Sequence, residues 1–295
     1  MSKLEVDQID PQSGTTLTLG TSGDTVVVPS GVILAPGGGL TLTGALAVDG
    51  GTVKLDGNYP VGTANVAMGD TALDSVEASG NYNVAIGADA LTANTTADNN
   101  TAVGALALKT NITGSRNTAL GFATLNLNAT GADNTAVGYA ALNVNLGSDN
   151  TAVGKSSLIA NTSGANNTAV GSGALDANTT ASSNTAVGTS ALGATTTGGN
   201  NTAFGCGALQ SNTEGLRNVG IGRLAIQGNT TACCNVALGD AALYTNQTGF
   251  KNIAMGTNAL YTNTGSCNTA VGHTALEANT TGTQNVAVGA TSLDA

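Results

Sequence analysis

The stretch Asn134–Leu142, Asn-Thr-Ala-Val-Gly-Tyr-Ala-Ala-Leu, recurs with small changes along most of this 295-residue chain. Successive copies are 16 to 18 residues apart. A nearly fixed period indicates a repeat architecture, and units this short bury a core only when they stack as a solenoid. The fourteen units begin at Asn65, Asn83, Asn100, Asn117, Asn134, Asn150, Asn167, Asn184, Asn201, Asn218, Asn235, Asn252, Asn268 and Asn285.

Each unit carries a fixed pattern, in which we count the opening asparagine as position 0. Position 2 is Ala in all units but one, position 3 is always apolar, and position 8 is Leu in all but one. In an extended segment, positions 1 and 3 share one face, and positions 0, 2 and 4 share the other. We predict that positions 3 and 8 supply the large core residues, among them Val137, Leu142, Val170 and Leu175.

Position 4 is glycine in every unit, for example Gly138 and Gly171. A strand followed by glycine indicates a turn that needs positive φ or a close backbone approach. Asparagine recurs at position 0 and also at position 11, as in Asn94 and Asn111. In a stack of coils these columns are expected to form ladders of side-chain amides.

Charged residues avoid positions 0 to 4, 7 and 8 in all fourteen units. Burying an unpaired charge is costly, so the protected positions mark the interior or an interface. The Thr, Val and Ile residues at position 1 favour strands, while the density of Asn, Gly and Thr disfavours helix. We therefore predict an all-β fold, a β-solenoid (β-roll or β-helix) of fourteen coils over residues 65–295. Stacked at about 4.8 Å per coil, these would form a rod of roughly 65 Å.

Residues 1–64 differ from the repeats and are predicted to form a small β-rich region. All 4 prolines lie there, between short runs of alternating apolar residues. The change at residues 58–60 is the predicted boundary. The net charge of −10 argues against electrostatic binding of nucleic acid or an anionic membrane. Neither a transmembrane run nor the apolar segment of a signal peptide is expected.

Candidate chemistry is sparse. Cys206, Cys233, Cys234 and Cys267 are interpreted as free thiols, and the adjacent pair is a poor metal or redox motif. The single His273 has no partner set for a zinc site. We predict no metal, no cofactor, no catalytic residue and no enzymatic activity.

Four aromatic residues at variable positions are candidates for binding: Phe122, Tyr139, Tyr244 and Tyr261. Exposed aromatics on a rod could contact sugars or a neighbouring fibre. The simpler interpretation is that they are scattered, solvent-facing turn residues.

The opening residues 1–10, Met-Ser-Lys-Leu-Glu-Val-Asp-Gln-Ile-Asp, with Gly-Thr-Thr-Leu-Thr-Leu-Gly at 14–20, resemble the N-terminus of virion fibre proteins of marine tailed phages, cyanophages especially. The Asn-Thr-Ala-Val-Gly repeat resembles repeats of phage tail fibres. It is also similar to the shorter Asn-x-x-Ala-(Ile/Val)-Gly repeat of trimeric autotransporter adhesin heads, which are trimers of β-rolls. The resemblance implies a homotrimeric fibre.

We expect a structural tail fibre that contributes to host-cell attachment, located in the virion and assembled in the host cytoplasm. Its partners would be other virion proteins, from tail, baseplate or capsid, bound through residues 1–64, and a host-surface receptor. A capsid-surface fibre or decoration protein is one alternative. An ice- or surface-binding solenoid, suggested by threonines at position 1, is another, and a bacterial surface adhesin is less favoured. Under this core assignment, Val137→Asp would abolish assembly and Tyr139→Asp would be tolerated.

Overall fold

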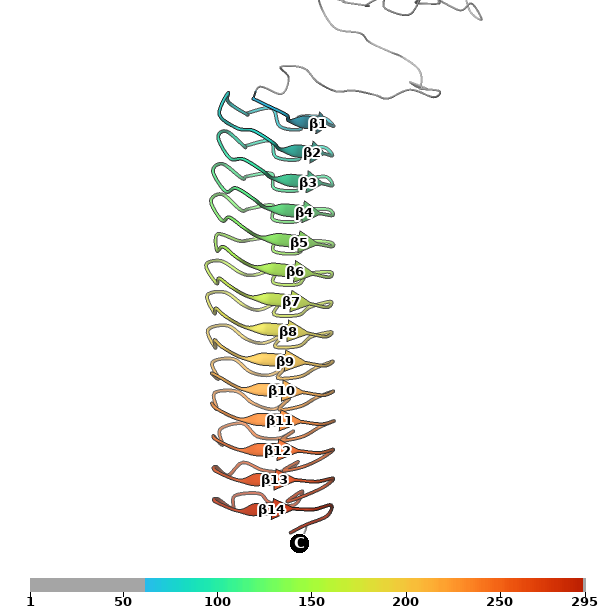
Figure 1. The fold of residues 1–295 in the computed structure, drawn as a ribbon, viewed down its shortest axis with the longest axis vertical. Helices are drawn as coiled ribbons and strands as arrows, with labels where there is room; N and C mark the ends of the chain where they lie inside the picture. The colour runs from blue at the N-terminus through green and yellow to red at the C-terminus, as the bar shows by residue number, and fades with distance from the viewer. Residues whose placement is uncertain (1–61, 294–295) are drawn as a thin grey trace, which may run out of the picture. The chain divides into compact units, whose positions relative to one another are not determined.

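A computed structural model of the chain describes residues 62–293. The predicted attachment region lies outside these residues except for 62–64, as does its boundary at 58–60. The described residues form a stack of coils with one three-residue strand per repeat (Figure 1). The strands are β1 (Val66–Met68), β2 (Val84–Ile86), β3 (Thr101–Val103), β4 (Thr118–Leu120), β5 (Thr135–Val137), β6 (Thr151–Val153), β7 (Thr168–Val170), β8 (Thr185–Val187), β9 (Thr202–Phe204), β10 (Val219–Ile221), β11 (Val236–Leu238), β12 (Ile253–Met255), β13 (Thr269–Val271) and β14 (Val286–Val288).

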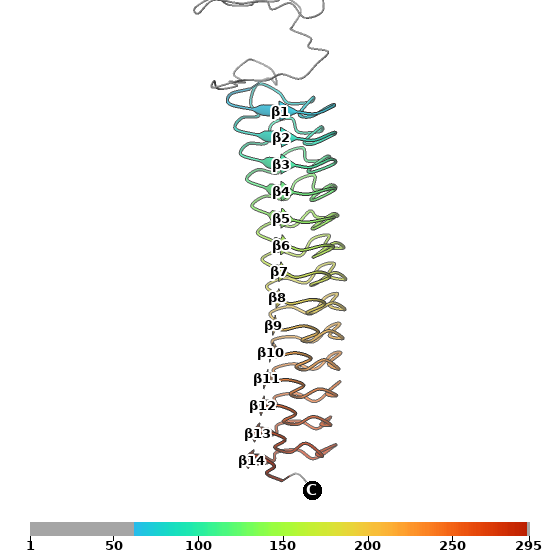
Figure 2. The same ribbon diagram turned by 90° about the vertical axis from the view of Figure 1, so that its right-hand side faces the viewer.

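The fourteen strands form one parallel sheet in sequence order. Each strand covers positions 1 to 3 and pairs in register with the next, as Ala119 does with Ala136. Figure 2 shows the coils stacked along one axis, with the line of strands turning gradually along the stack. The predicted all-β solenoid with coils of about 17 residues is confirmed.

Coils of unequal length keep the same register because the difference lies in one turn. The unit that begins at Asn134 has 16 residues, yet Thr135 still pairs with Thr151. In that unit the position-11 amide of Asn145 bonds to a carbonyl two residues later, at Gly147, instead of three residues later. The residue is therefore removed from the turn after position 11, and the strand and core are unchanged.

The core is narrow and consists of small residues with one leucine per coil. Position-7 alanines and, from Ala85 onward, position-2 alanines are buried, and the position-8 leucines from Leu73 to Leu260, including Leu142 and Leu175, have no exposed surface. At the one unit with glycine at position 2, Gly220, a Cβ would lie 3.4 Å from the Cδ1 atom of Leu209. Alanine is thus the residue that fills the space between the strand and the leucine of the preceding coil.

Position 3 does not belong to this core, so the assignment of Val137 and Val170 as buried residues is wrong for the single chain. Val137 is half-buried and Val170 is 36% exposed. The physical reason is strand alternation: Ala136 and its equivalents at position 2 point inward, so positions 1 and 3 point outward. Leucine at position 8 alone supplies the large buried side chain.

Position 4 requires glycine because its φ is positive and because the backbone of the next coil lies close to it. Gly138 has φ +126° and Gly171 has φ +139°. A Cβ on Gly138 would lie 2.8 Å from the carbonyl carbon of Gly154 in the next coil. The buried leucines also adopt left-handed conformations, with φ 49° at Leu142 and 52° at Leu175. Left-handed backbone costs an L-residue roughly 1–2 kcal/mol, so contacts with neighbouring coils must hold these residues in place.

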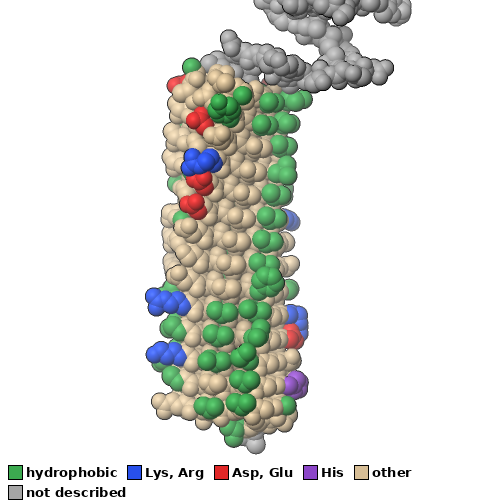
Figure 3. Space-filling view, in the orientation of Figure 1, with side chains coloured by type: hydrophobic (Ala, Val, Ile, Leu, Met, Phe, Trp, Pro, Cys, Tyr) green, Lys and Arg blue, Asp and Glu red, His purple; other side chains and the backbone are tan. Residues whose placement is uncertain are grey.

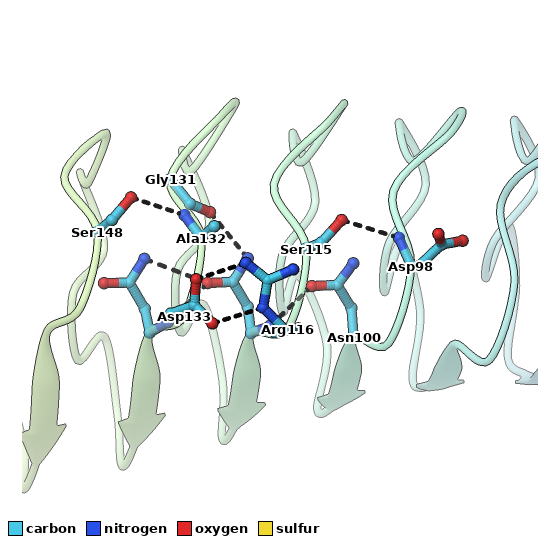
Figure 4. A network of polar contacts seen from close by, with 10 residues as sticks. Asp98, Asn100, Ser115, Arg116, Gly131, Ala132, Asp133 and Ser148 are labelled. Carbon is cyan, nitrogen blue, oxygen red and sulfur yellow. Dashed lines mark hydrogen bonds and ion pairs between the residues drawn. The ribbon is translucent and has the colours of Figure 1, made fainter.

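Buried asparagines supply many of those contacts (Figure 4). The Oδ1 of Asn117, at position 0, accepts from the backbone N–H of Asn134 in the next coil, at 3.0 Å. The Nδ2 of Asn117 and that of Asn128, at position 11, both donate to the carbonyl of Gly131, each at 2.8 Å. Asn128 also donates to the Oδ1 of Asn111 in the preceding coil, at 3.0 Å. The two amide ladders therefore close each coil and join it to its neighbours.

The position-11 ladder is interrupted where Thr195 replaces asparagine. Thr195 is buried and donates to the carbonyl of Asn212 at 3.0 Å. It has no amide to offer the preceding coil, and the buried Oδ1 of Asn178 has no hydrogen-bond partner within the described protein. The Oδ1 atoms of Asn229 and Asn246 are also unpartnered, although asparagine fills position 11 there.

We predict that Thr195→Asn stabilises the solenoid. The new Nδ2 group would satisfy Asn178 and continue the ladder to Asn212, and a net hydrogen bond is worth about 1 kcal/mol. Thermal or denaturant unfolding should show a higher free energy of unfolding than the parent chain. The matched control Thr196→Asn, one residue away and half-buried, should give no such gain. Equal or lower stability of Thr195→Asn would contradict the ladder assignment.

Candidate functional site

The outward-facing surface of the sheet is the most extensive candidate site. We call positions 1 and 3 of β1–β14 the outer sheet face. Its position-3 side chains are large and exposed in many coils; Leu120 is 47% exposed and Phe204 is 55% exposed. Figure 3 shows hydrophobic side chains running along the stack over the strands, with charged side chains to either side. Monomeric proteins rarely leave a contiguous apolar surface of such length uncovered.

No charged residue occupies positions 1 or 3 of the strands from β1 to β14. The position-1 residues are Thr, Val or Ile and are half-buried or exposed. Position 3 is therefore apolar along the whole stack, position 1 adds threonine hydroxyl groups, and neither position carries a charge. Sequence reasoning missed its outward direction, although the small alanine at position 2 was the available signal.

Charged side chains pair along the axis, beside the outer sheet face. Arg116 and Asp133 precede position 0 in adjacent coils, and two bonds of 2.6 and 2.7 Å join the guanidinium to the carboxylate (Figure 4). The hydrogen bond from Arg116 lowers the pKa of Asp133 below its ordinary value. Exposed pairs such as this contribute little to stability, and they place no isolated charge on the apolar face.

The four aromatic candidates form two stacked pairs. The ring centroids of Phe122 and Tyr139 are 5.5 Å apart, and those of Tyr244 and Tyr261 are 5.0 Å apart. Both separations are close to the spacing of about 4.8 Å between coils, so each pair stacks along the rod axis. Stacking covers one face of each ring, so that face cannot stack on a sugar. The predicted role of these residues in binding stays a prediction.

Two open grooves lie on the side of the rod where Tyr244 and Tyr261 are found. One, of about 620 Å³, is lined by Tyr244 and Tyr261 together with Arg223, Asp240 and Glu277. The Arg223 guanidinium pairs with Asp240 at 2.9 Å.

The other groove, of about 430 Å³, is lined by Asp176, Ser190, Gln210 and Gln227. Burial raises the pKa of Asp176 above its ordinary value. Neither groove contains a histidine or cysteine in its lining, so neither offers the usual base or a thiol nucleophile for covalent catalysis.

The remaining candidates are dispersed. His273 is exposed. Cys206 and Cys267 are exposed free thiols, whereas Cys233 and Cys234 are half-buried neighbours. Among residues 62–293, no group of three His, Cys, Asp or Glu side chains is arranged to hold a metal ion. That part of the chain also contains no helix long and apolar enough to cross a membrane.

Comparison with known proteins adds no assignment. No protein-family model matches the sequence, and no curated protein matches it. The similarity to phage fibres and adhesin heads rests on the residues quoted in the sequence analysis and stays a prediction.

We predict that the Tyr244–Tyr261 stack stabilises adjacent coils directly. In a double-mutant cycle with Tyr244→Ala and Tyr261→Ala, the coupling free energy should be about 0.5–1.5 kcal/mol, the range of aromatic pairs. The control cycle pairs Tyr261→Ala with Tyr82→Ala, a tyrosine near the other end of the described stack, and should be additive. Unfolding by denaturant provides the measurement, and equal coupling in both cycles would show that the stack contributes nothing specific.

Proposed function

We propose that this chain is the shaft of a structural virion fibre, a phage tail fibre that contributes to host-cell attachment and catalyses no reaction. We further propose that it acts as a homotrimer, with the outer sheet faces of three copies packed together around a common axis. The observation that carries the proposal is the uncharged apolar surface that extends over all fourteen strands.

Symmetry explains why such a surface suits self-association. When copies are related by a rotation axis parallel to the rod, a residue close to the axis meets the same residue of the other copies. A charge there would meet like charges at short range in a dry environment, which is strongly unfavourable. An uncharged side chain such as Thr, Val, Leu or Ile can contact its own copies without electrostatic repulsion. The exclusion of charge from positions 1 and 3 is therefore what a parallel, in-register assembly requires.

The repeat also suits a mechanical role. The same backbone and asparagine bonds recur from coil to coil, so every junction along the axis is held by an equivalent set of bonds. The two grooves are open, and neither lining holds a histidine or a cysteine. Residues 1–64 would join the fibre to other virion proteins, and exposed side chains of the shaft or its end would meet the host-surface receptor.

The assembly can be tested with Leu120→Asp/Val137→Asp, two changes on the outer sheet face in adjacent coils. Light scattering should give three times the chain mass for the parent and one chain mass for the variant. Circular dichroism should show an intact solenoid in both, because these side chains do not enter the coil core. Tyr139→Asp, beside that face, should remain trimeric. Leu142→Asp should lose the fold, because it buries an unpaired carboxylate.

A parent chain that is monomeric would overturn the trimer. A double variant that stays trimeric would move the interface to another face. If Leu120→Asp/Val137→Asp unfolded the chain to the same extent as Leu142→Asp, the position-3 side chains would have to be core residues.

The place of the fibre in a particle is a separate question. An antibody against the repeats should label tail fibres in electron micrographs of intact virions. Labelling of the capsid surface would favour the alternative of a capsid fibre or decoration protein. Absence from purified particles would contradict both.

An ice-binding role has one specific observation in its favour, the outward row of threonines at position 1 from Thr101 to Thr202. Val219, Val236 and Val286 continue the row without hydroxyl groups, and the larger position-3 side chains stand beside it. We therefore rank this function below the fibre; thermal hysteresis in a solution of the chain would reverse the order.

A further inference from the structure

Cys233 and Cys234 bring two thiols together on the surface of the stack. Their Sγ atoms are 3.1 Å apart, and both side chains are half-buried. They fill the last two positions of the unit that begins at Asn218. The other units hold varied residues there, from Ser182-Ser183 to Leu216-Arg217 and Phe250-Lys251, so the repeat itself does not require cysteine at either position.

The backbone fixes the geometry of the pair. The N–H of Cys234 donates to the carbonyl of Leu216 in the preceding coil, at 3.0 Å, and the N–H of Lys251 in the next coil donates to the carbonyl of Cys233, at 3.2 Å. Both polar groups of the peptide between the cysteines are therefore held by adjacent coils. The thiols lie on a rigid scaffold, so a ligand that binds both does not have to order them first.

Two cations flank the pair. Arg217 and Lys251 occupy the position of Cys234 in the preceding and following coils. Hydrogen bonding with Cys234 and burial raise the pKa of Cys233, while the charges of Lys251 and Arg217 act in the opposite direction. The pKa of Cys233 is raised overall, so a soft centre that binds its sulfur has to displace the thiol proton. The charges also offset the negative charge that two thiolates would bring to this surface.

Although adjacent cysteines are a poor metal motif by sequence, their 3.1 Å Sγ–Sγ separation leads us to propose that Cys233 and Cys234 form a bidentate binding site for a soft, thiophilic metal or metalloid centre. Thiolates select soft ions, and the pair supplies two ligands at one point of the rod. Because the described chain brings no third His, Cys, Asp or Glu to this place, a four-coordinate zinc site would be incomplete. Centres that are satisfied by two protein sulfurs, such as a trivalent organoarsenical, fit better. This inference concerns a different surface and does not depend on the proposed fibre function.

The reaction with an arsenoxide balances without an oxidant. Two As–S bonds form to the sulfurs of Cys233 and Cys234, and the As=O bond is lost. The two thiol protons and the oxide oxygen leave as water, so arsenic stays trivalent and both sulfurs stay reduced. The second As–S bond forms within one molecule, where the effective concentration of the second thiol favours ring closure.

The test uses the full chain, reduced with a phosphine, and phenylarsine oxide as the probe. One equivalent should bind per chain, consume two titratable thiols and add the mass of one phenylarsenic group less that of the two thiol hydrogens. Cys206→Ser/Cys267→Ser removes the isolated thiols and should bind as the parent does. Cys233→Ser and Cys234→Ser should each weaken binding about 100-fold, because the intramolecular second bond is lost. Circular dichroism confirms that every variant is folded.

Three results would overturn the site: no binding to the folded parent chain, loss of binding in Cys206→Ser/Cys267→Ser, or unchanged affinity in Cys233→Ser or Cys234→Ser. The second would assign the probe to the isolated cysteines, and the third would show that one thiol is sufficient.

Discussion

Hydrogen bonding between consecutive coils is the constraint on which the rest of this structure depends. A single coil buries one leucine and a few alanines, which is too little apolar surface to offset the cost of ordering some 17 residues. It also holds leucines such as Leu142 in the left-handed region. Each coil is stable because its neighbours pair with its strand and because buried asparagines such as Asn117 close it and connect it to the next.

This constraint also determines the surface. The inside of a thin coil accepts alanine, asparagine and one leucine, so the larger position-3 residues must point outward, as Leu120 and Phe204 do. Charges are confined to the turns, where Arg116 and Asp133 pair between coils. The result is a rod with one long apolar face bordered by charge. Self-association through that face is what we propose from this arrangement.

Much of the fold could be predicted from the sequence because the repeat presents the same physical problem fourteen times. The period, Gly138 at the turn, Leu142 in the core and the asparagine ladders followed from strand alternation and burial. Val137 and Val170 were misplaced because a large apolar residue was preferred for the interior over the smaller Ala136. The left-handed leucines, the stacked tyrosine pair and the approach of Cys233 to Cys234 depend on coil geometry, which residue type alone does not encode.

The most direct test is the exchange of asparagine side-chain amide protons with deuterium, measured by nuclear magnetic resonance. If buried ladders hold the coils together, the Nδ2 protons at positions 0 and 11, such as those of Asn117 and Asn128, should exchange orders of magnitude more slowly than those of the exposed Asn166. The ladder amides should stay protected from exchange through the middle of the stack. Exchange of the Asn117 and Asn128 amides as fast as that of Asn166 would contradict the account.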